Sequence, residues 1–207
     1  MPNCKILGTK YQGGNFDISK KKRDSLEGCP QHVYGHFECY QNRLFNLIGG
    51  PQQVDGWFNC NNNQLTSLVG VPQHITGGFN CLGNNLKTLV GGPQKVDIGY
   101  DCSYNQLTNL DGCASHIGST LCCGNNQITS LVSIHKIIKS CPKIYFDFRL
   151  ITQGGIGLLL IDNLTYISCF NVIPFEIISK YLGSGTKGMM ECSKELIKKG
   201  YENYAKL

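Results

Sequence analysis

The chain has 207 residues, a formal net charge of +5 and 12 cysteines. This length suffices to bury a core in one or two domains, and the longest apolar run near the C-terminus, 156–161, is too short to cross a bilayer. The first residues lack the apolar stretch of a secretory signal, so we expect a cytoplasmic protein whose cysteines stay reduced and pack as small hydrophobic side chains.

The positive charge lies outside the central part of the chain. Between Asp24 and Ile134, seven acidic residues outnumber three basic ones, whereas basic residues gather at 20–23 and after residue 135. A short basic run is usually a solvated edge, and an acidic surface repels phosphate. We therefore expect no nucleic-acid partner for the central part, and the basic ends leave nucleic-acid or small-ligand binding as an alternative.

One sequence unit repeats along most of the chain, and the stretch 51–71 shows it most clearly. Four of its columns are Pro30, Pro51, Pro72 and Pro93; Cys39, Cys60, Cys81, Cys102 and Cys123; Asn42, Asn63, Asn84, Asn105 and Asn126; and Leu26, Leu47, Leu68, Leu89, Leu110 and Leu131. One such unit cannot bury its own apolar face, so neighbouring units must stack on each other. A fixed period of this length therefore predicts a solenoid.

In chain order, we expect a degenerate capping repeat at 9–29, regular repeats at 30–134 and a closing strand at 135–150, which together form a solenoid domain, 1–150. Alternation of apolar or small residues with polar ones around Val54, Phe58 and Cys60 predicts one short parallel strand in each repeat. The glycine and proline that end each unit predict an extended, turn-like return segment.

Two of the repeated columns have an expected structural role. We predict that the asparagine column is buried, with its amides bonded to the backbone of the adjoining turn. The glycine column is expected to adopt backbone conformations that a side chain disfavours; it comprises Gly28, Gly49, Gly70, Gly91 and Gly112.

The remaining residues, 151–207, do not repeat, and we predict that they form a small helical C-terminal cap over the open end of the stack. Residues 174–182 are typical of a short helix with proline at its first position, ended by Gly183. Thr186 is expected to cap a second helix, which places Met189 and Cys192 on its apolar side.

The spacing F-x-C-x-x-N-x-L in the repeats resembles the second half of the leucine-rich-repeat consensus, although Val54 or Ile75 stands one place earlier than its first leucine. The short unit with its return proline is similar to the repeats of bacterial effector proteins, with one residue more. This resemblance implies an α/β solenoid, a right-handed leucine-rich-repeat superhelix with short parallel strands, an extended or turn-like convex side and binding through the concave face.

The C-terminal sequence also resembles the tails of leucine-rich-repeat proteins of bacteriophages and large DNA viruses. The resemblance lies in PFEIISKYLGSG…ECSKELIKKGYENYAKL. This resemblance implies a viral protein that modulates or inhibits a host protein, for example a defence component, in the host cytoplasm.

The outward positions of the predicted strands supply the candidate binding residues. If Phe58 and Cys60 point inward, Trp57 points outward, and the only tryptophan of the chain then lies beside tyrosines, a histidine and carboxylates. That composition is typical of a binding patch, although cross-strand aromatic pairs also stabilise sheets. The candidates are Tyr34, His36, Glu38, Tyr40, Asp55, Trp57, Asn59, Asn80 and Asp101.

We therefore predict a protein without enzymatic activity that binds a protein partner with a basic or polar surface. No metal or cofactor is expected, because a line of parallel cysteines is a poor tetrahedral site and the GGIG at 154–157 lacks a phosphate-binding lysine. Of the thiols, Cys122 would face outward and is the expected reactive one. Bacterial effectors with similar repeats can carry a ubiquitin-ligase domain, and this resemblance leaves an enzyme that uses Cys169 or Cys192 as an alternative.

Overall fold

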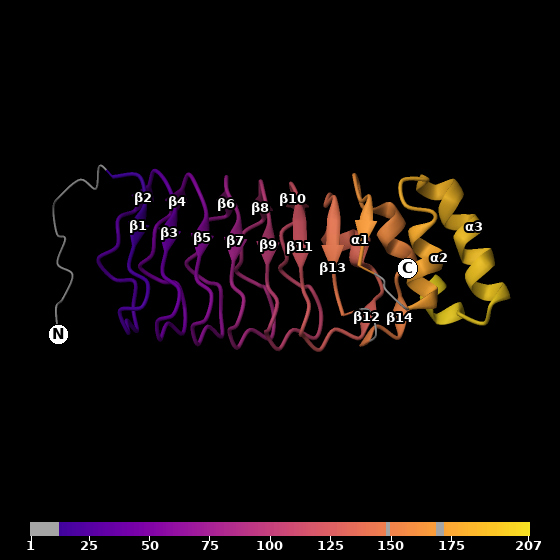
Figure 1. Ribbon diagram of the computed structural model, residues 1–207, viewed down its shortest axis with the longest axis horizontal. Coiled ribbons are helices and arrows are strands. Elements are labelled where there is room, and N and C mark those ends of the chain that lie inside the picture. Colours follow the sequence, from indigo (N-terminus) through magenta and orange to yellow (C-terminus); the bar gives the residue numbers. More distant parts are fainter. Residues whose placement is uncertain (1–12, 148–149, 169–171) are drawn as a thin grey trace.

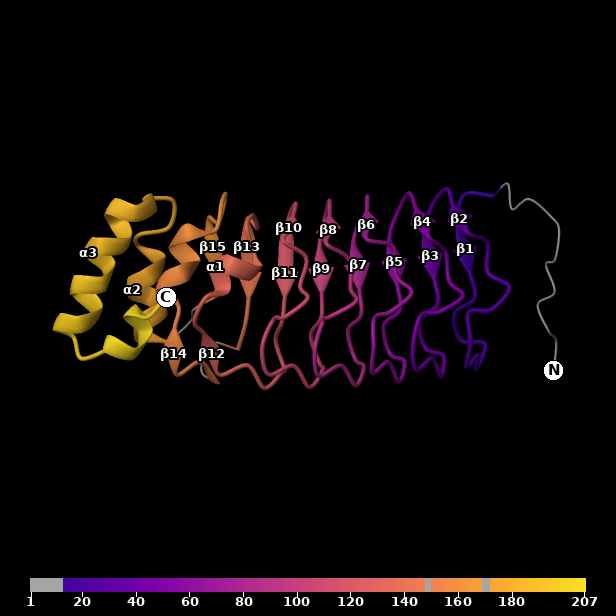
Figure 2. The same cartoon turned by 180° about the vertical axis from the view of Figure 1, so that it is seen from behind.

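A computed structural model describes residues 13–147, 150–168 and 172–207 of the protein. The chain winds into a parallel β-solenoid of about seven turns, and its longer helices lie together at the C-terminal end of the stack (Figure 1). Successive coils lie side by side in chain order, so residues about 21 positions apart become neighbours (Figure 2).

One side of the solenoid is a parallel sheet of eight strands, with one strand from each coil. Its strands are β1 (Phe16–Asp17), β3 (Phe37–Glu38), β5 (Phe58–Asn59), β7 (Phe79–Asn80), β9 (Tyr100–Asp101), β11 (Thr120–Cys122), β13 (Lys143–Tyr145) and β15 (Tyr166–Ile167). The register follows the repeat, because Phe58 pairs with Phe37 on one side and with Phe79 on the other.

A second row of short strands lies before β3, β5, β7, β9 and β11 in the chain. It consists of a pair, β2 (His32–Val33) and β4 (Gln53–Val54), and a three-stranded sheet, β6 (His74–Ile75), β8 (Lys95–Val96) and β10 (His116–Ile117). Isolated bridges from Ser140 to His116 and Asp162 extend this row towards the C-terminus. A further pair, β12 (Ser130–Leu131) and β14 (Gln153–Gly154), lies near the return turns.

The core of the solenoid is a set of side-chain columns that run along its axis. Rings in the aromatic column contact one another, with centroids 4.9 Å apart between Phe37 and Phe58, 5.8 Å between Phe58 and Phe79 and 5.1 Å between Phe79 and Tyr100. Both Phe58 and Cys60 are 0% exposed, so the predicted inward orientation is confirmed. Burial of each such ring contributes about 1.5–3 kcal/mol to folding.

The asparagine column forms the predicted ladder of buried amides. In Asn63, the Nδ2 group donates to the carbonyl oxygens of Cys60 at 3.0 Å and Cys39 at 3.1 Å, while Oδ1 accepts from the Leu44 N–H at 3.1 Å. Each amide thus satisfies backbone groups of its own coil and of the preceding one. The same pattern of donation recurs at Asn42, Asn84, Asn105 and Asn126.

The glycine column occupies the return turns in a left-handed conformation, as predicted. Its φ angles range from +84° to +105°, a region in which a Cβ atom is disfavoured. The residues concerned are Gly28, Gly49, Gly70, Gly91 and Gly112.

The coils after β11 depart from the predicted closing strand at 135–150. Residues 134–137 form a short helix, α1 (Ile134–Ile137), and the strand within that range is β13 (Lys143–Tyr145), preceded by the isolated bridges of Ser140. Ile144 pairs with Leu121, so it lies in the aromatic column instead of the cysteine column of Cys123, in which the period of the repeat places it. The coil between Leu121 and Ile144 is therefore two residues longer than the repeat, and α1 accommodates the two extra residues.

Parallel strand pairing also extends past residue 150, the predicted end of the solenoid. Strand β14 pairs with β12, β15 pairs with β13, and between them lies a short 3₁₀ helix, η2 (Ile156–Leu160). Ile167 pairs with Ile144, so this coil has the same longer spacing as the one before it. Residues up to Ile167 therefore form a further coil of the solenoid, and the helices begin after it.

The C-terminal helices are α2 (Ile173–Ser179), α3 (Gly185–Lys198) and the 3₁₀ helix η3 (Glu202–Ala205). Pro174 stands in the first turn of α2, but α3 begins at Gly185, so Thr186 lies inside it and is not its cap. The Tyr204 hydroxyl donates to the Ile151 carbonyl at 2.9 Å, which ties this end of the chain to the last coil. No helix within the described ranges is long and apolar enough to span a membrane.

Candidate binding face

The outward positions of the eight-stranded sheet form two rows, and we call these rows, together with Tyr40 beside them, the outer face. The first row contains Asp17, Glu38, Asn59, Asn80 and Asp101, aligned as direct partners across β1, β3, β5, β7 and β9. The second row, two residues earlier in each coil, contains His36, Trp57, Gly78 and Gly99. Neighbours within a row are about 4.8 Å apart, as in any parallel sheet.

Trp57 lies flat on this face because the next coil carries glycine at the matching position. A methyl group on Gly78 would lie only 2.3–2.5 Å from Cζ3, Cε3 and Cη2 of the Trp57 ring, and one on Gly99 would lie 3.9 Å from Cη2. One face of the indole therefore covers the backbone at Gly78 and its edge reaches Gly99. Trp57 is 37% exposed, and the opposite face of its ring is directed towards solvent.

The His36 side chain is hydrogen-bonded to the backbone of Trp57 in the next coil. Its Nδ1 accepts a hydrogen bond from the Trp57 backbone N–H at 2.9 Å, and its own backbone N–H donates to Asn15 Oδ1 at 2.9 Å. The imidazole thus links two coils through a nitrogen that must be unprotonated to accept the bond.

The first row is ordered by short local hydrogen bonds. The Oδ1 atoms of Asn59, Asn80 and Asp101 accept from the backbone N–H two residues later, at 3.3, 3.0 and 2.9 Å. These bonds hold each side chain upright at the end of its strand, as Asn and Asp commonly do.

Glu38 is a partly buried carboxylate in this row. Burial raises its pKa above the ordinary value, a hydrogen bond from Asn59 Nδ2 at 2.8 Å partly opposes this, and the charge of Asp17 raises the pKa further. The pKa of Asp17 itself is lowered, chiefly by hydrogen bonds from Ser19. A partly desolvated carboxylate on an open face favours the approach of a cation.

Tyr40 lies at the N-terminal side of the face and already contacts a cation of the chain. The Lys20 Nζ lies 5.5 Å from the centroid of its ring, within the range of a cation–π interaction. A basic run such as 20–23 is typical of a solvated edge, and this composition alone does not indicate that Lys20 contacts an aromatic ring. The repeat spacing could have predicted this contact, because Lys20 and Tyr40 are about one repeat apart in the sequence.

Two of the nine predicted contact residues lie elsewhere. The ring of Tyr34 packs on His32 of the second strand row, with centroids 3.9 Å apart, and Asp55 accepts from His32 Nε2 at 2.8 Å and Gln53 Nε2 at 3.0 Å. The prediction that they stand beside Trp57 is wrong, because a bend at Asp55 and Gly56 separates the two strand rows. The outer face retains His36, Glu38, Tyr40, Trp57, Asn59, Asn80 and Asp101.

Asp97 occupies the same repeat position as Asp55, two coils later. It accepts from His74 Nε2 at 2.9 Å and from Lys95 Nζ at 2.9 Å. Burial alone would raise its pKa, but these hydrogen bonds outweigh burial and lower it. For Asp55, the bonds from Gln53 and then His32 likewise lower the pKa.

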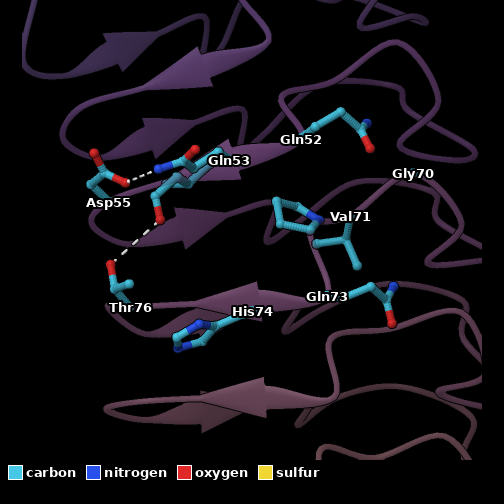
Figure 3. Close-up of a pocket in the computed structure, with 10 residues that line it drawn as sticks. Gln52, Gln53, Asp55, Gly70, Val71, Gln73, His74 and Thr76 are labelled. Atoms are coloured by element: carbon cyan, nitrogen blue, oxygen red, sulfur yellow. Dashed lines mark hydrogen bonds between the residues drawn. The ribbon is translucent and has the colours of Figure 1, made fainter.

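A polar hollow of about 610 Å³ lies along the second strand row (Figure 3). Its polar side chains bond to neighbouring groups of the chain: Gln53 bonds to Asp55, and the Thr76 hydroxyl donates to the Val54 carbonyl at 3.5 Å. The Thr76 bond joins adjacent coils, whereas the Gln53 bond lies within one coil. The hollow is lined by Gln52, Gln53, Val54, Asp55, Gly70, Val71, Pro72, Gln73, His74 and Thr76.

The cysteines that the sequence analysis considered for chemistry are held as thiols. Burial raises the pKa of both Cys122 and Cys192 to about 11, so neither carries much thiolate at neutral pH. Among the described cysteines, Cys122 alone is not buried, which agrees with its predicted outward position, and its reactivity stays a prediction. Cys169 lies outside the described residues. Within those residues, no group of three or more His, Cys, Asp or Glu side chains could hold a metal ion.

Comparison with protein-family models, with curated proteins and with solved structures finds no match to this chain. The geometry of the outer face is therefore the basis on which a function can be inferred.

Proposed function

We propose that the protein is a non-enzymatic binding module that engages a protein partner through the outer face. The observation that carries this proposal is the position of Trp57: an indole held flat against Gly78, open on one side, with His36 and the row of carboxylates and amides around it. A rigid exposed aromatic residue flanked by polar groups is typical of the energetic centre of a protein interface.

The kind of partner follows from the charge of the face and from the resemblances in the sequence. Three carboxylates, Asp17, Glu38 and Asp101, favour a partner surface that is basic or rich in donors. In a right-handed leucine-rich-repeat solenoid, the corresponding sheet is the concave binding side. The tail resembles those of viral leucine-rich-repeat proteins, which supports a host protein as the partner, such as a defence component in the host cytoplasm.

A capture experiment with a matched control tests the proposal. The double variant Tyr40→Ala, Trp57→Ala removes both aromatic side chains from the face, whereas Ile48→Ala, Val69→Ala removes two apolar side chains that are 59% and 51% exposed in the return turns. Immobilised wild-type protein and both variants are exposed to host-cell extract, and bound proteins are identified by mass spectrometry.

We expect a partner that binds the wild type and the return-turn variant but is lost from the aromatic variant. Circular dichroism and melting temperature should remain similar in all three proteins, which separates loss of contact from loss of fold. A partner retained by the aromatic variant would show that the outer face is not the binding site.

A further inference from the structure

The indole of Trp57 is a flat platform with one free face. Its other face is fixed on Gly78, which is buried beneath it, and its edge reaches towards Gly99 in the following coil. None of the described residues places a cation over this ring, whereas Tyr40 on the same face is already contacted by Lys20. The platform is therefore both preformed and open, which reduces the entropy that a ligand loses on binding.

A carboxylate stands diagonally beside the platform. Gly99, which the indole edge approaches, lies two residues before Asp101, and Asp101 pairs with Asn80 across β7 and β9. The Oδ1 atom of Asp101 is bonded to the Ser103 N–H at 2.9 Å, so the carboxylate is held in place, while no described residue bonds to Oδ2. Residues two apart on one strand point to the same face and lie about 7 Å apart, so one long side chain can reach both the indole edge at Gly99 and Asp101.

The charge of the face favours a cation from outside the chain. The positions that face outward on β3, β5, β7 and β9, and those two residues before and after them, contain no lysine or arginine. They do contain Glu38 and Asp101, and Glu38 is partly desolvated without a cationic partner of its own among the described residues.

Of the cationic side chains, arginine fits both parts of this arrangement. Its guanidinium group is planar and stacks on aromatic faces, and its edge donates two parallel hydrogen bonds to a carboxylate. Lysine offers a compact, strongly hydrated charge that gains less from a flat ring.

We propose that Trp57 and Asp101 form a subsite for an arginine side chain of the protein partner, in which the guanidinium stacks on the open face of the indole and pairs with the Asp101 carboxylate. This inference rests on the proposed function, since it names the group that the partner brings to the outer face.

Because Trp57 is the only tryptophan in the chain, its fluorescence reports directly on this subsite. We would titrate the full-length protein with three blocked tripeptides, Gly-Arg-Gly, Gly-Lys-Gly and Gly-citrulline-Gly, and with a neutral oligosaccharide. Citrulline keeps the planar shape of arginine without its charge. We expect a saturable change with the arginine peptide, with affinity about 3- to 10-fold weaker for lysine and weaker again for citrulline.

Two charge-removing variants locate the contact. Asp101→Asn should weaken arginine binding about 3-fold, whereas Asp111→Asn, an exposed carboxylate in a return turn, should leave it unchanged. In Trp57→Ala the backbone amide resonances of Gly78 and Gly99, followed by NMR, should no longer shift with the peptide. The dispersion of the same NMR spectra shows whether each variant is folded.

Equal affinity for arginine and citrulline peptides, no saturable response to arginine, or preferential binding of the oligosaccharide would each overturn the arginine assignment. The capture experiment is read separately. Partner capture that is lost from the aromatic variant, without arginine binding to the wild type, leaves the proposed function standing and removes this inference. Arginine binding together with a partner retained by the aromatic variant leaves an arginine-binding site but removes the outer face as the docking site and the partner as the source of the arginine.

Discussion

Gly78 determines where the Trp57 ring can lie. An alanine methyl group at this position would overlap the ring, with distances of 2.3–2.5 Å to three of its atoms. We expect Gly78→Ala to displace the indole, to shift its fluorescence emission and to destabilise the protein by about 1–3 kcal/mol, as overpacking generally does.

The matched control for this prediction is the same substitution in a Trp57→Ala background. With the ring gone, Gly78→Ala should be neutral or slightly stabilising, because alanine restricts the unfolded chain more than glycine does. Urea denaturation of the four proteins gives the coupling energy between the two sites. A coupling energy near zero would contradict the placement of the ring on Gly78.

Glu38 should make stability depend on pH with a definite sign. Its pKa is raised above the ordinary value of 4.5, mainly by burial, so the folded protein binds this proton more tightly than the unfolded chain does. The contribution of Glu38 to stability is therefore lost as the pH rises through the range just above 4.5. Thermal melts of Glu38→Gln should show a higher melting temperature than wild type at pH 7 and no difference at pH 3.5 (about one unit below the ordinary value).

Tyr100 occupies the aromatic column in which the four preceding coils carry phenylalanine. Its hydroxyl is buried and has no hydrogen-bond partner within the described structure. We expect Tyr100→Phe to stabilise the protein by about 1 kcal/mol, because it removes a buried polar group that makes no bond in return. Chemical denaturation measures this change, and a loss of stability would show that the hydroxyl is bonded in solution.

At the scale of the element, the asparagine ladder holds the turns that no strand reaches. Asn84 donates to the carbonyl oxygens of Cys60 at 3.2 Å and Cys81 at 2.9 Å and accepts from the Leu65 N–H at 3.0 Å. We expect Asn84→Ala to cost about 2–4 kcal/mol, since it leaves several buried backbone groups without partners.

The neighbouring Asn85 provides the control for Asn84. Asn85 is exposed, and its side chain makes one weak contact, accepting from Gln106 Nε2 at 3.4 Å. Asn85→Ala should therefore change the free energy of unfolding by less than about 0.5 kcal/mol. Equal effects of the two substitutions in urea denaturation would contradict the structural role of the ladder.

The short strands also show how far the sequence could predict these elements. Period-two alternation correctly assigned Phe58 and Cys60 to the core and Trp57 to the surface, because all three lie within or beside one strand. It failed at Asp55 because alternation holds only inside a continuous strand. At Gly56 the chain bends so closely past the preceding coil that a methyl group would lie 2.5 Å from His36 Nδ1 and 2.7 Å from the Gly35 carbonyl.

At the scale of the whole molecule, the regular coils could be predicted and the last ones could not. From residue 30 to 134 the cysteine and asparagine columns mark every coil, and the proline column marks all but the last, so the register can be counted. Beyond Leu131 these landmarks disappear, and the offset between paired strands grows by two, as a comparison of the pair Phe58 and Phe79 with the pair Leu121 and Ile144 shows. The sequence also did not predict that the Trp57 ring lies flat on the sheet, because this position depends on a glycine from another coil.

The same stacked architecture predicts how damage at one end should spread. Each coil contacts mainly its neighbours, so stability is close to a sum of local terms along the axis. Phe175 of α2 is 0% exposed, and its ring meets Tyr204 edge-on at 5.6 Å at the end of the stack. We expect Phe175→Ala to destabilise the protein by about 3–5 kcal/mol and to loosen the nearest coils most.

Native-state hydrogen exchange can resolve this gradient, because it reports the opening of each coil separately. Amide protection in Phe175→Ala should fall strongly in β13 and β15 and little in β3 and β5, which lie at the opposite part of the stack (Figure 1). Ile173→Ala, on the same helix but 52% exposed, should leave protection nearly unchanged throughout. A uniform loss of protection along all coils would instead mean that the solenoid unfolds as one cooperative unit. In that case, the helices at its end would stabilise the outer face as well as the coils they cover.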